Sequence, residues 1–331
     1  MVSALTATNL TLLDWAKRKD PNGAIPDIVE LLEQTNEILT DAVVMEGNLE
    51  TGHQVTVRTG LPTVYWRILN LGTSPSKSTT AQVTESCAIL DAWSVVDEDL
   101  ANLGGNQRQL RFTEAQAFLE AMNQEWAGTL FYGNAGTAPE EFTGLATRYS
   151  SLSAGNADNI ISAGGSGSDN YSVWLIIWGN NTCFLTFPKG STAGIFHRDL
   201  GLQEYTDSSG RKMMVYEDQW KLKTGLVVKD WRYVARICNI DVSNLVGITS
   251  AADLQYYMTK AIYRIPNIRA GKAAFYMNRT TAEYLDHQRR ADVASGGQLS
   301  YDVVDGKRIM SFRGIPIRIC DQLVTETTAV S

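Results

Sequence analysis

The chain has 331 residues, of which 44% are hydrophobic and 20% are charged, a composition typical of a folded protein with a substantial core and not of a disordered one. Its formal net charge is −7, so the protein as a whole would repel nucleic acid, and any contact with DNA has to come from a local patch. The longest apolar run, residues 173–178, is too short to cross a bilayer.

The four cysteines (Cys87, Cys183, Cys238 and Cys320) are far apart in the sequence and form no CxxC pair. This spacing favours small buried side chains that stay reduced over a zinc site or a disulfide framework. The first residues lack a basic segment followed by an apolar core. We therefore expect no signal peptide and a protein that folds in a cytoplasm.

The N-terminal third alternates between helical and strand patterns. Residues 27–45 predict a helix that starts near Pro26. Residues 54–58 alternate as a strand does, and residues 63–68 are rich in β-branched and aromatic side chains, which favours a second strand. Residues 86–103 carry an apolar stripe at helical spacing, which predicts a second helix.

Residues 54–85 predict an extended two-stranded arm with residues 72–80 at its tip. A hairpin of this kind is marginal when isolated. Burying a large apolar side chain contributes about 1.5–3 kcal/mol, so the body of the chain or a second copy is expected to cover these residues. The apolar side chains of the arm are Val55, Val57, Val64, Tyr65, Trp66 and Ile68.

The third predicted helix, residues 112–130, has the clearest signals. Thr113 and Gln116 match a capping box, and Gly133 follows its end. Its apolar stripe is expected to form core contacts, and its main members are Phe118, Leu119, Met122 and Trp126.

The rest of the chain predicts mostly strands. Two runs, residues 171–178 and 182–187, flank Gly-Asn-Asn and predict a hairpin. Residues 220–240 predict two long strands with a bend between them, and residues 307–312 and 315–319 predict strands on either side of Arg313-Gly314.

Two further helices are expected in the C-terminal third. Ser250 with Asp253 marks the start of one, and Thr280 with Glu283 marks the start of the other, which follows a strand over residues 273–277. The Gly/Ser-rich residues 162–169 predict a surface loop. No internal repeat of fixed period is present.

Three short motifs match the signatures of serine β-lactamases and penicillin-binding proteins in the right order: Ser74-x-x-Lys77, Ser168-Asp169-Asn170 and Lys223-Thr224-Gly225. A serine acylase needs the serine at the start of a buried helix, with the lysine amine one turn along. The sequence after Ser74 has no helical apolar stripe, and the second motif lies in a Gly/Ser-rich loop. The acylase hypothesis is therefore a minor alternative.

Other candidate sites have simpler explanations. A phosphate loop ending at Lys77 lacks the required glycines, and His53, His197 and His287 have no metal-binding spacing. The acidic run at residues 97–99 predicts a solvated helix face, and the basic runs at 17–19 and 289–290 predict hydrated surface that could touch phosphates only non-specifically. We expect no cofactor, no metal and no catalytic residue.

Several segments together resemble the major capsid proteins of short-tailed bacteriophages, in particular the kind found in Bordetella phages. The resemblance covers most of residues 13–323. The segments that carry it are residues 51–67, 131–134, 139–145, 187–190, 220–241, 275–279 and 312–316.

That resemblance implies the α+β capsid fold of the HK-ninety-seven type, with an N-terminal arm, an extended hairpin called the E-loop, a spine helix, a peripheral domain and an axial domain. The long strands precede the axial β–α unit here, so a reordered version of the fold is expected. The implied division is residues 1–50 for the N-terminal arm and helix, 51–92 for the E-loop hairpin, 93–150 for helices including the spine helix, 151–245 for the long-stranded peripheral sheet, and 246–331 for the axial domain.

The resemblance also implies a structural protein that assembles, in the bacterial host cytoplasm, as hexamers and pentamers into the icosahedral head shell of a virion around double-stranded DNA. The E-loop of such proteins lies across the adjacent subunit, which places Val64, Tyr65, Trp66, Ile68 and Lys77 at a subunit contact. A separate scaffolding protein, the portal and a decoration protein are further implied partners, with non-specific contact to the packaged DNA and none to a membrane. Some relatives cross-link through an E-loop lysine, and Lys77 is in the right place for one. An encapsulin-like compartment shell is the alternative function.

Overall fold

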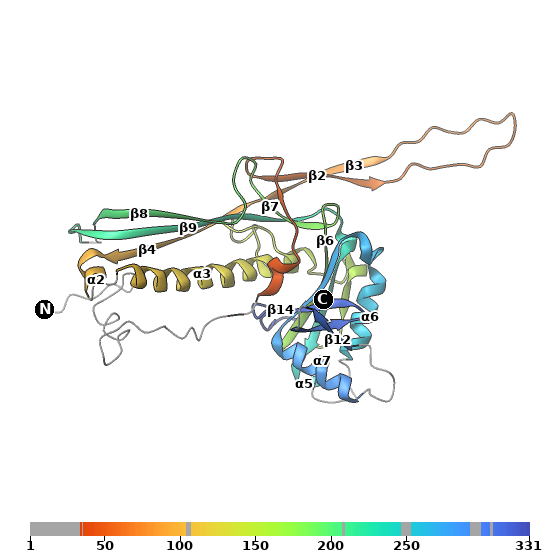
Figure 1. The fold of residues 1–331 in the computed structure, drawn as a ribbon. Helices are drawn as coiled ribbons and strands as arrows, with labels where there is room; N and C mark the ends of the chain where they lie inside the picture. Colours follow the sequence, from red (N-terminus) through yellow and green to blue (C-terminus); the bar gives the residue numbers. More distant parts are fainter. Residues whose placement is uncertain are drawn as a thin grey trace. The chain divides into compact units, whose positions relative to one another are not determined.

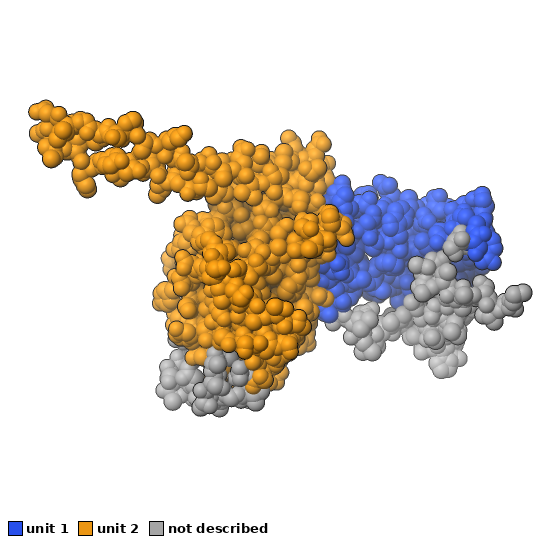
Figure 2. Space-filling view, turned by 180° about the vertical axis from the view of Figure 1, so that it is seen from behind, with its two compact units in different colours: residues 1–34, 89–127, 194–223 blue, residues 35–88, 128–193, 224–331 orange. Residues whose placement is uncertain are grey.

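The computed structural model describes residues 34, 36–103, 107–206, 209–245, 253–291, 299–304 and 307–331. The start of the first predicted helix, the basic run at residues 17–19 and Ser250 lie outside these residues. The chain divides into two compact units: unit 1 comprises residues 1–34, 89–127 and 194–223, and unit 2 comprises residues 35–88, 128–193 and 224–331 (Figure 2).

Unit 1 combines a long helix with a small antiparallel sheet. The helix α3 (Gln107–Tyr132) contributes its residues up to 127. The sheet contains β8 (Ile195–Thr206), β9 (Lys212–Val228) up to residue 223 and β4 (Ala88–Asp97) from residue 89, with β9 in the middle (Figure 1). A short helix, α2 (Glu98–Asn102), follows β4 and is capped by the Asp97 carboxylate.

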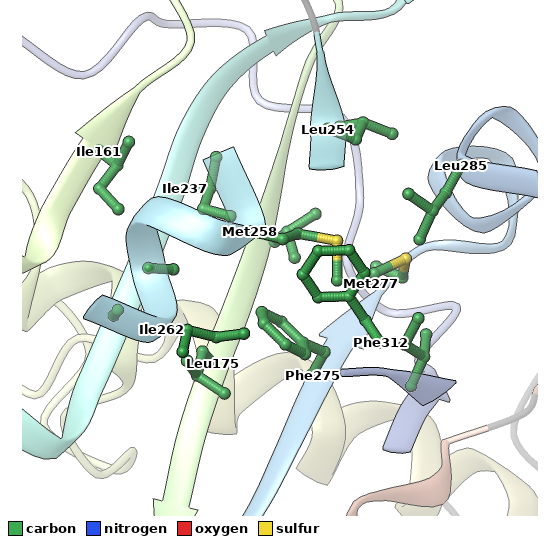
Figure 3. Close-up of a cluster of buried hydrophobic side chains, with 14 of the residues drawn as sticks. Ile161, Leu175, Ile237, Leu254, Met258, Ile262, Phe275, Met277, Leu285 and Phe312 are labelled. Atoms are coloured by element: carbon green, nitrogen blue, oxygen red, sulfur yellow. The ribbon is translucent and has the colours of Figure 1, made fainter. Parts of the chain in front are cut away.

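The core of unit 2 is built around β6 (Asn170–Trp178), which pairs antiparallel with β10 (Val234–Asp241) and β11 (Lys272–Met277). The helices α6 (Leu254–Arg264) and α7 (Arg279–Ala291) pack on one face of these strands. Figure 3 shows Met258 and Ile262 of α6 beside Phe275 of β11 in this core.

The other face of β6 is also buried, which explains why its sequence is a continuous apolar run instead of an alternating one. Trp174 packs against Phe131 and Tyr149, with ring centroids 6.0 Å and 5.9 Å away. Trp178 donates a hydrogen bond from Nε1 to the Tyr276 hydroxyl at 2.8 Å, so the polar atom of this buried indole is satisfied.

Shorter elements complete the fold. In chain order they are η1 (Glu37–Thr40), β1 (Val44–Glu46), α4 (Leu145–Arg148), η2 (Ala157–Asn159), β5 (Ile160–Ser162), β7 (Cys183–Phe187), η3 (Trp231–Tyr233), α5 (Val242–Leu245), η4 (Ile268–Ala270), β12 (Leu299–Val304), β13 (Lys307–Phe312) and β14 (Ile315–Ile319). β14 pairs parallel with β11, and β13 and β12 follow it in the sheet.

A buried ion pair ties a late segment of the chain to the centre of unit 2. The Arg236 guanidinium donates to Glu326 Oε1 at 2.6 Å, to the Tyr149 carbonyl at 2.7 Å and to Ser172 Oγ at 3.1 Å. Four residues later, the Val330 amide donates to Asn239 Oδ1 at 2.8 Å. Because the Arg236 side chain is only 4% exposed, its charge depends on the Glu326 carboxylate for compensation.

Several local predictions are confirmed. The strand at residues 54–58 lies in β2 (Gly52–Gly60), and the bend in residues 220–240 is the η3 turn between β9 and β10. The helix expected near Ser250 and Asp253 is α6, and Asp253 itself is its cap, since its carboxylate accepts from the Tyr256 amide at 3.0 Å. The turn between β13 and β14 places Arg313 and Gly314 at φ of 51° and 79°, the left-handed conformation of a tight hairpin turn.

Other predictions are wrong. Residues 44–46 form the strand β1, and residues 86–103 form β4 and then α2 in place of one helix. Residues 63–68 form no strand. The predicted hairpin does not form, because β7 meets β6 at a single residue pair and pairs instead with β9 and β1.

The capping boxes predicted at Thr113 and at Thr280 also differ in the structure. The helix α3 begins before Thr113, whose hydroxyl donates to the Gln109 carbonyl at 2.8 Å within the helix. At the start of α7 the capping side chain is Asn278, whose Oδ1 accepts from the Thr280 amide at 2.9 Å. Side-chain oxygens near a helix start can serve several positions, so the motif alone did not fix the first residue.

The four cysteines are free thiols, and Cys183, Cys238 and Cys320 are buried as expected. Burial raises the pKa of Cys183 and of Cys320 to about 12. No helix among the described residues is long and apolar enough to span a membrane.

Candidate assembly surface

An extended arm projects from unit 2 (Figures 1 and 2). It consists of β2 and β3 (Thr79–Ser86), paired antiparallel from Gly52↔Ser86 to Gly60↔Thr79, and of the tip loop, residues 61–78. The predicted arm is confirmed, but its second strand is residues 79–86 and not 63–68. The tip loop is held by local bonds, such as Ser76 Oγ to the Thr63 carbonyl at 2.6 Å and the Leu71 amide to the Ile68 carbonyl at 3.2 Å.

The tip loop presents a concentration of apolar side chains to water. Trp66 is fully exposed and Val64 is 86% exposed. The sequence-predicted contact residues Tyr65, Ile68 and Lys77 are exposed as well. Leu61, Leu69 and Leu71 join them, and the sequence analysis missed these three because they flank the run that it took for a strand. Exposed apolar side chains in this number mark an interaction site and not an ordinary surface.

The arm is also positively charged. Residues 51–84 contain Arg58, Arg67 and Lys77 and no Asp or Glu, although the whole chain has a net charge of −7. An arm that is both apolar and cationic is complementary to an apolar, acidic surface.

The base of the arm is anchored in unit 2. Val55 is 5% exposed and packs with Phe184 and Val227, and Val57 packs against the same cluster. The body of the protomer therefore covers the apolar residues at the base of the arm, whereas those of the tip loop stay uncovered.

A bidentate ion pair fixes the end of β3. Arg148 Nη1 and Nη2 donate to the two carboxylate oxygens of Glu85 at 2.5 Å and 2.7 Å, and Nη2 also donates to the Thr143 carbonyl at 3.1 Å. This geometry is the strongest form of a carboxylate contact. A Cβ at Gly52 would lie 2.0 Å from the Glu85 carbonyl oxygen, so the tight approach of β2 to β3 at this point requires glycine.

His53 adds a titratable group to the base of the arm. Its ring meets the Phe184 ring edge-on at 5.3 Å. Burial, together with the positive charge of Lys229, lowers the pKa of His53. The imidazole is therefore held neutral, in keeping with its place in an apolar cluster.

The four predicted core residues of the long helix lie in different environments. Met122 and Trp126 are buried, and Phe118 is half-buried and stacks on Trp220 with ring centroids 5.3 Å apart. Leu119 is exposed, so within the protomer it adds little to the core of unit 1.

The helix is also attached to the sheet of unit 1 by charge. Arg111 Nε donates to Asp218 Oδ2 at 3.0 Å, and its Nη2 donates to Asp199 Oδ1 at 2.6 Å. The hydrogen bond from Arg111 lowers the pKa of Asp199, and His197 Nε2 lies 3.0 Å from Asp218 Oδ1. Sequence spacing gave no signal for this network, because its members come from distant elements.

Two of the three acylase-like motifs do not lie in acylase-like surroundings, whereas Lys223-Thr224-Gly225 lies in the strand β9. Ser74 and Lys77 are in the exposed tip loop, with no helix to present them. Asn170 is buried and donates from Nδ2 to the Gly167 carbonyl at 2.6 Å, which is a turn contact. Across the described residues, no group of three or more His, Cys, Asp or Glu side chains could hold a metal ion.

Comparison with known proteins identifies the family. Residues 20–331 match the family model for major capsid protein GP7. The chain belongs to this family. A solved structure of bacteriophage Epsilon15 is 34% identical, with a TM-score of 0.76, and the match covers 98% of each chain. The bacteriophage JBD30 capsid is 11% identical, with a TM-score of 0.47, and covers 88% of this chain and 92% of that one. No curated protein matches.

The family assignment confirms the expected fold class and function. The chain is a major capsid protein of a tailed bacteriophage, and it assembles with copies of itself into the head shell of the virion. The arm (residues 52–86) occupies the place in the chain where the E-loop of the HK-ninety-seven-type fold was expected, and α3 occupies the place of the spine helix. The long strand β9 precedes the β11–α7 unit in the chain.

Proposed function

We propose that the tip loop of each subunit docks on a neighbouring copy of the chain, and that this contact links capsomers of five and six subunits into a closed icosahedral shell around packaged double-stranded DNA. The observation that carries the proposal is the full exposure of Trp66 among neighbouring exposed apolar residues. A single protomer leaves that surface in water, and a self-assembling chain supplies many copies to cover it.

The energetics suit a lattice of repeated modest contacts. The tip loop, residues 61–78, is shorter than the roughly 20–30 residues that each side of a stable interface contributes. A subunit that gives one loop and receives another makes two such contacts, and a closed shell makes all of them at once. Effective concentration then turns weak pairwise contacts into a stable assembly.

The test removes the loop and leaves its base intact. A variant in which residues 61–78 are replaced by Asn-Gly keeps the β2–β3 pairing, because Asn-Gly forms the tight turn of a hairpin. The variant is expected to stay as soluble protomers in sedimentation and negative-stain microscopy, while the wild type forms capsomers or shells. Shells of normal size from the loopless variant would contradict the proposal. A second variant with Gly-Ser inserted after Gly190, an exposed turn, controls for loop editing as such.

We further propose a domain division and a set of partners. Unit 1 corresponds to the peripheral domain, and unit 2 corresponds to the axial domain together with the E-loop. A separate scaffolding protein, the portal and a decoration protein complete the head. Co-expression with the neighbouring genes of the phage tests these partners, since a scaffold is expected to raise the yield of uniform shells.

Neither acyl transfer nor cross-linking is part of the proposal. The exposed Lys77 amine has no buried setting that would make it a base for Ser74, so a labelled β-lactam is expected to leave Ser74 unmodified. Cross-linking through Lys77 would require a buried carboxylate beside both partners. Assembled shells are therefore expected to run as one monomer band on denaturing gels, and a ladder that disappears with Lys77→Arg would overturn this expectation.

A further inference from the structure

The helix α6 has two contrasting faces. Leu254, Met258, Ala261 and Ile262 point into the core of unit 2 (Figure 3). The opposite face carries Tyr256, Lys260, Tyr263 and Arg264, which lie at positions i, i+4, i+7 and i+8 and therefore on one side of the helix. Tyr263 is 77% exposed, and Tyr256 and Lys260 are exposed too. Inward packing of α6 leaves this side free of contacts to the core.

The positive charge continues beyond the helix. Residues 254–272 contain Lys260, Arg264, Arg269 and Lys272 and no Asp or Glu. Arg269 lies in η4 and Lys272 starts β11, and both are exposed. We call the six residues Tyr256, Lys260, Tyr263, Arg264, Arg269 and Lys272 the basic face.

Acidic neighbours only partly offset the basic face. Asp253 accepts a hydrogen bond from the Tyr256 amide as the cap of α6. Asp158 pairs with Arg264 at 3.5 Å, but its side chain is 81% exposed, so the pair is weak. Lys260, Arg269 and Lys272 present their charge to the surroundings of the protomer.

We propose that the basic face binds the phosphate backbone of the packaged double-stranded DNA. Three features favour this occupant. The face is a cluster of cations in a chain of net charge −7, it spreads those cations along a helix and the turn after it, and its tyrosine hydroxyls can donate to phosphate oxygens. Contacts of this type position DNA without selecting a sequence. This property suits the inner surface of a shell, which contacts DNA of every sequence in the genome. The inference rests on the proposed enclosure of DNA.

A local cluster of cations on a protein of negative net charge is consistent with DNA binding of this kind. Each phosphate contact releases counterions and contributes affinity that falls steeply with salt. A few contacts per subunit hold the outermost DNA layer in place, while the negative charge of the remaining surface keeps the DNA from spreading over the wall.

Binding of a short fluorescent DNA duplex of mixed sequence tests the proposal. The full-length chain is used as unassembled capsomers, and anisotropy is followed between about 50 and 200 mM salt. Lys260→Gln with Arg269→Gln is expected to lower the slope of log affinity against log salt by about 2, since each lost phosphate contact removes about 1. The matched control, Lys189→Gln with Arg198→Gln, removes two exposed cations elsewhere and is expected to leave the slope nearly unchanged.

Two results would overturn the proposal: no DNA binding by the wild-type chain, or an equal loss in the variant and its control. If the basic-face variant keeps DNA binding but no longer assembles, the face contacts another subunit, and the proposal is wrong. Assembly is scored by microscopy on the same samples, so failure of the shell function is seen separately. If the double variant does not fold, Arg269→Gln alone is used, with an expected loss in slope of about 1.

Ultraviolet irradiation of DNA-filled heads gives a second readout on the intact particle. Peptides that contain Tyr256 or Tyr263 are expected among those linked to DNA. DNA-linked peptides that come only from other regions would contradict the proposed site.

Discussion

Replacing Trp66 by alanine separates assembly from folding. The Trp66 side chain is fully exposed in the protomer, so its removal should change the free energy of unfolding by no more than about 0.5 kcal/mol. If a neighbouring subunit covers it, about 150–250 Å² of surface leaves water, which at about 25 cal/mol per Å² is worth about 4–6 kcal/mol. Even half of this value weakens each loop contact by roughly 30- to 150-fold.

The assay compares two tryptophan variants. Trp66→Ala is expected to keep the wild-type Tm and to raise the protein concentration needed for assembly, measured by light scattering and sedimentation. Trp126 is only 5% exposed, so Trp126→Ala is expected to lower the free energy of unfolding by about 3–5 kcal/mol. The reasoning would be refuted if Trp66→Ala lowered the Tm as Trp126→Ala does, or if it assembled at the wild-type concentration.

Three further outcomes follow from the structure. Arg148→Ala should lower the free energy of unfolding, measured by urea titration, by about 3–5 kcal/mol, because it leaves the Glu85 carboxylate buried and unpaired. A loss below about 1 kcal/mol would show that the pair is solvated. Because burial raises the pKa of Cys183 and of Cys320 to about 12, these thiols should not react with a disulfide reagent at pH 8 until the protein is denatured, and rapid labelling of either in the native protein would contradict their burial. Assembly should weaken as salt rises, since residues 51–84 of the arm carry Arg58, Arg67 and Lys77 and no Asp or Glu; assembly that is indifferent to salt would mean that the receiving surface is not acidic.

The sequence was most informative where local pattern and environment agree. Residues 171–178 predicted a strand, and they form β6, which is buried on both faces. The tight turn at Arg313-Gly314 was also identified correctly, because it depends on residues next to one another in the chain. Local chemistry is sufficient for features of this kind.

The sequence pattern gave wrong predictions where the spacing of apolar residues fits both a helix and a strand. It also gave no signal where a residue's contact partner lies far away in the chain. In β4, Ile89 and Trp93 are spaced by four, which suits a helix, and also by an even number, which suits an exposed strand face. β3 is polar and exposed, and it becomes a strand only by pairing with β2 across the tip loop. The Arg148–Glu85 pair at the base of the arm joins residues far apart in the chain, and no spacing rule identifies such a pair.

The apolar excess of the tip loop was visible in the sequence although its conformation was not. The expectation that the hairpin alone cannot cover Trp66 depended only on composition and on the marginal stability of a lone hairpin. Composition does not change with the strand boundaries, so the error in the second strand left this expectation intact.

The late ion pair between Arg236 and Glu326 bears on the timing of synthesis. The ribosome makes the arm, with its exposed apolar tip loop, early in translation. The strand β14 and the Glu326 carboxylate that compensates Arg236 are made only with residues 315–326, near the end of the chain. A chain that stops before Glu326 therefore lacks the carboxylate that compensates Arg236, and unit 2 can reach the packing described above only once residue 326 is present.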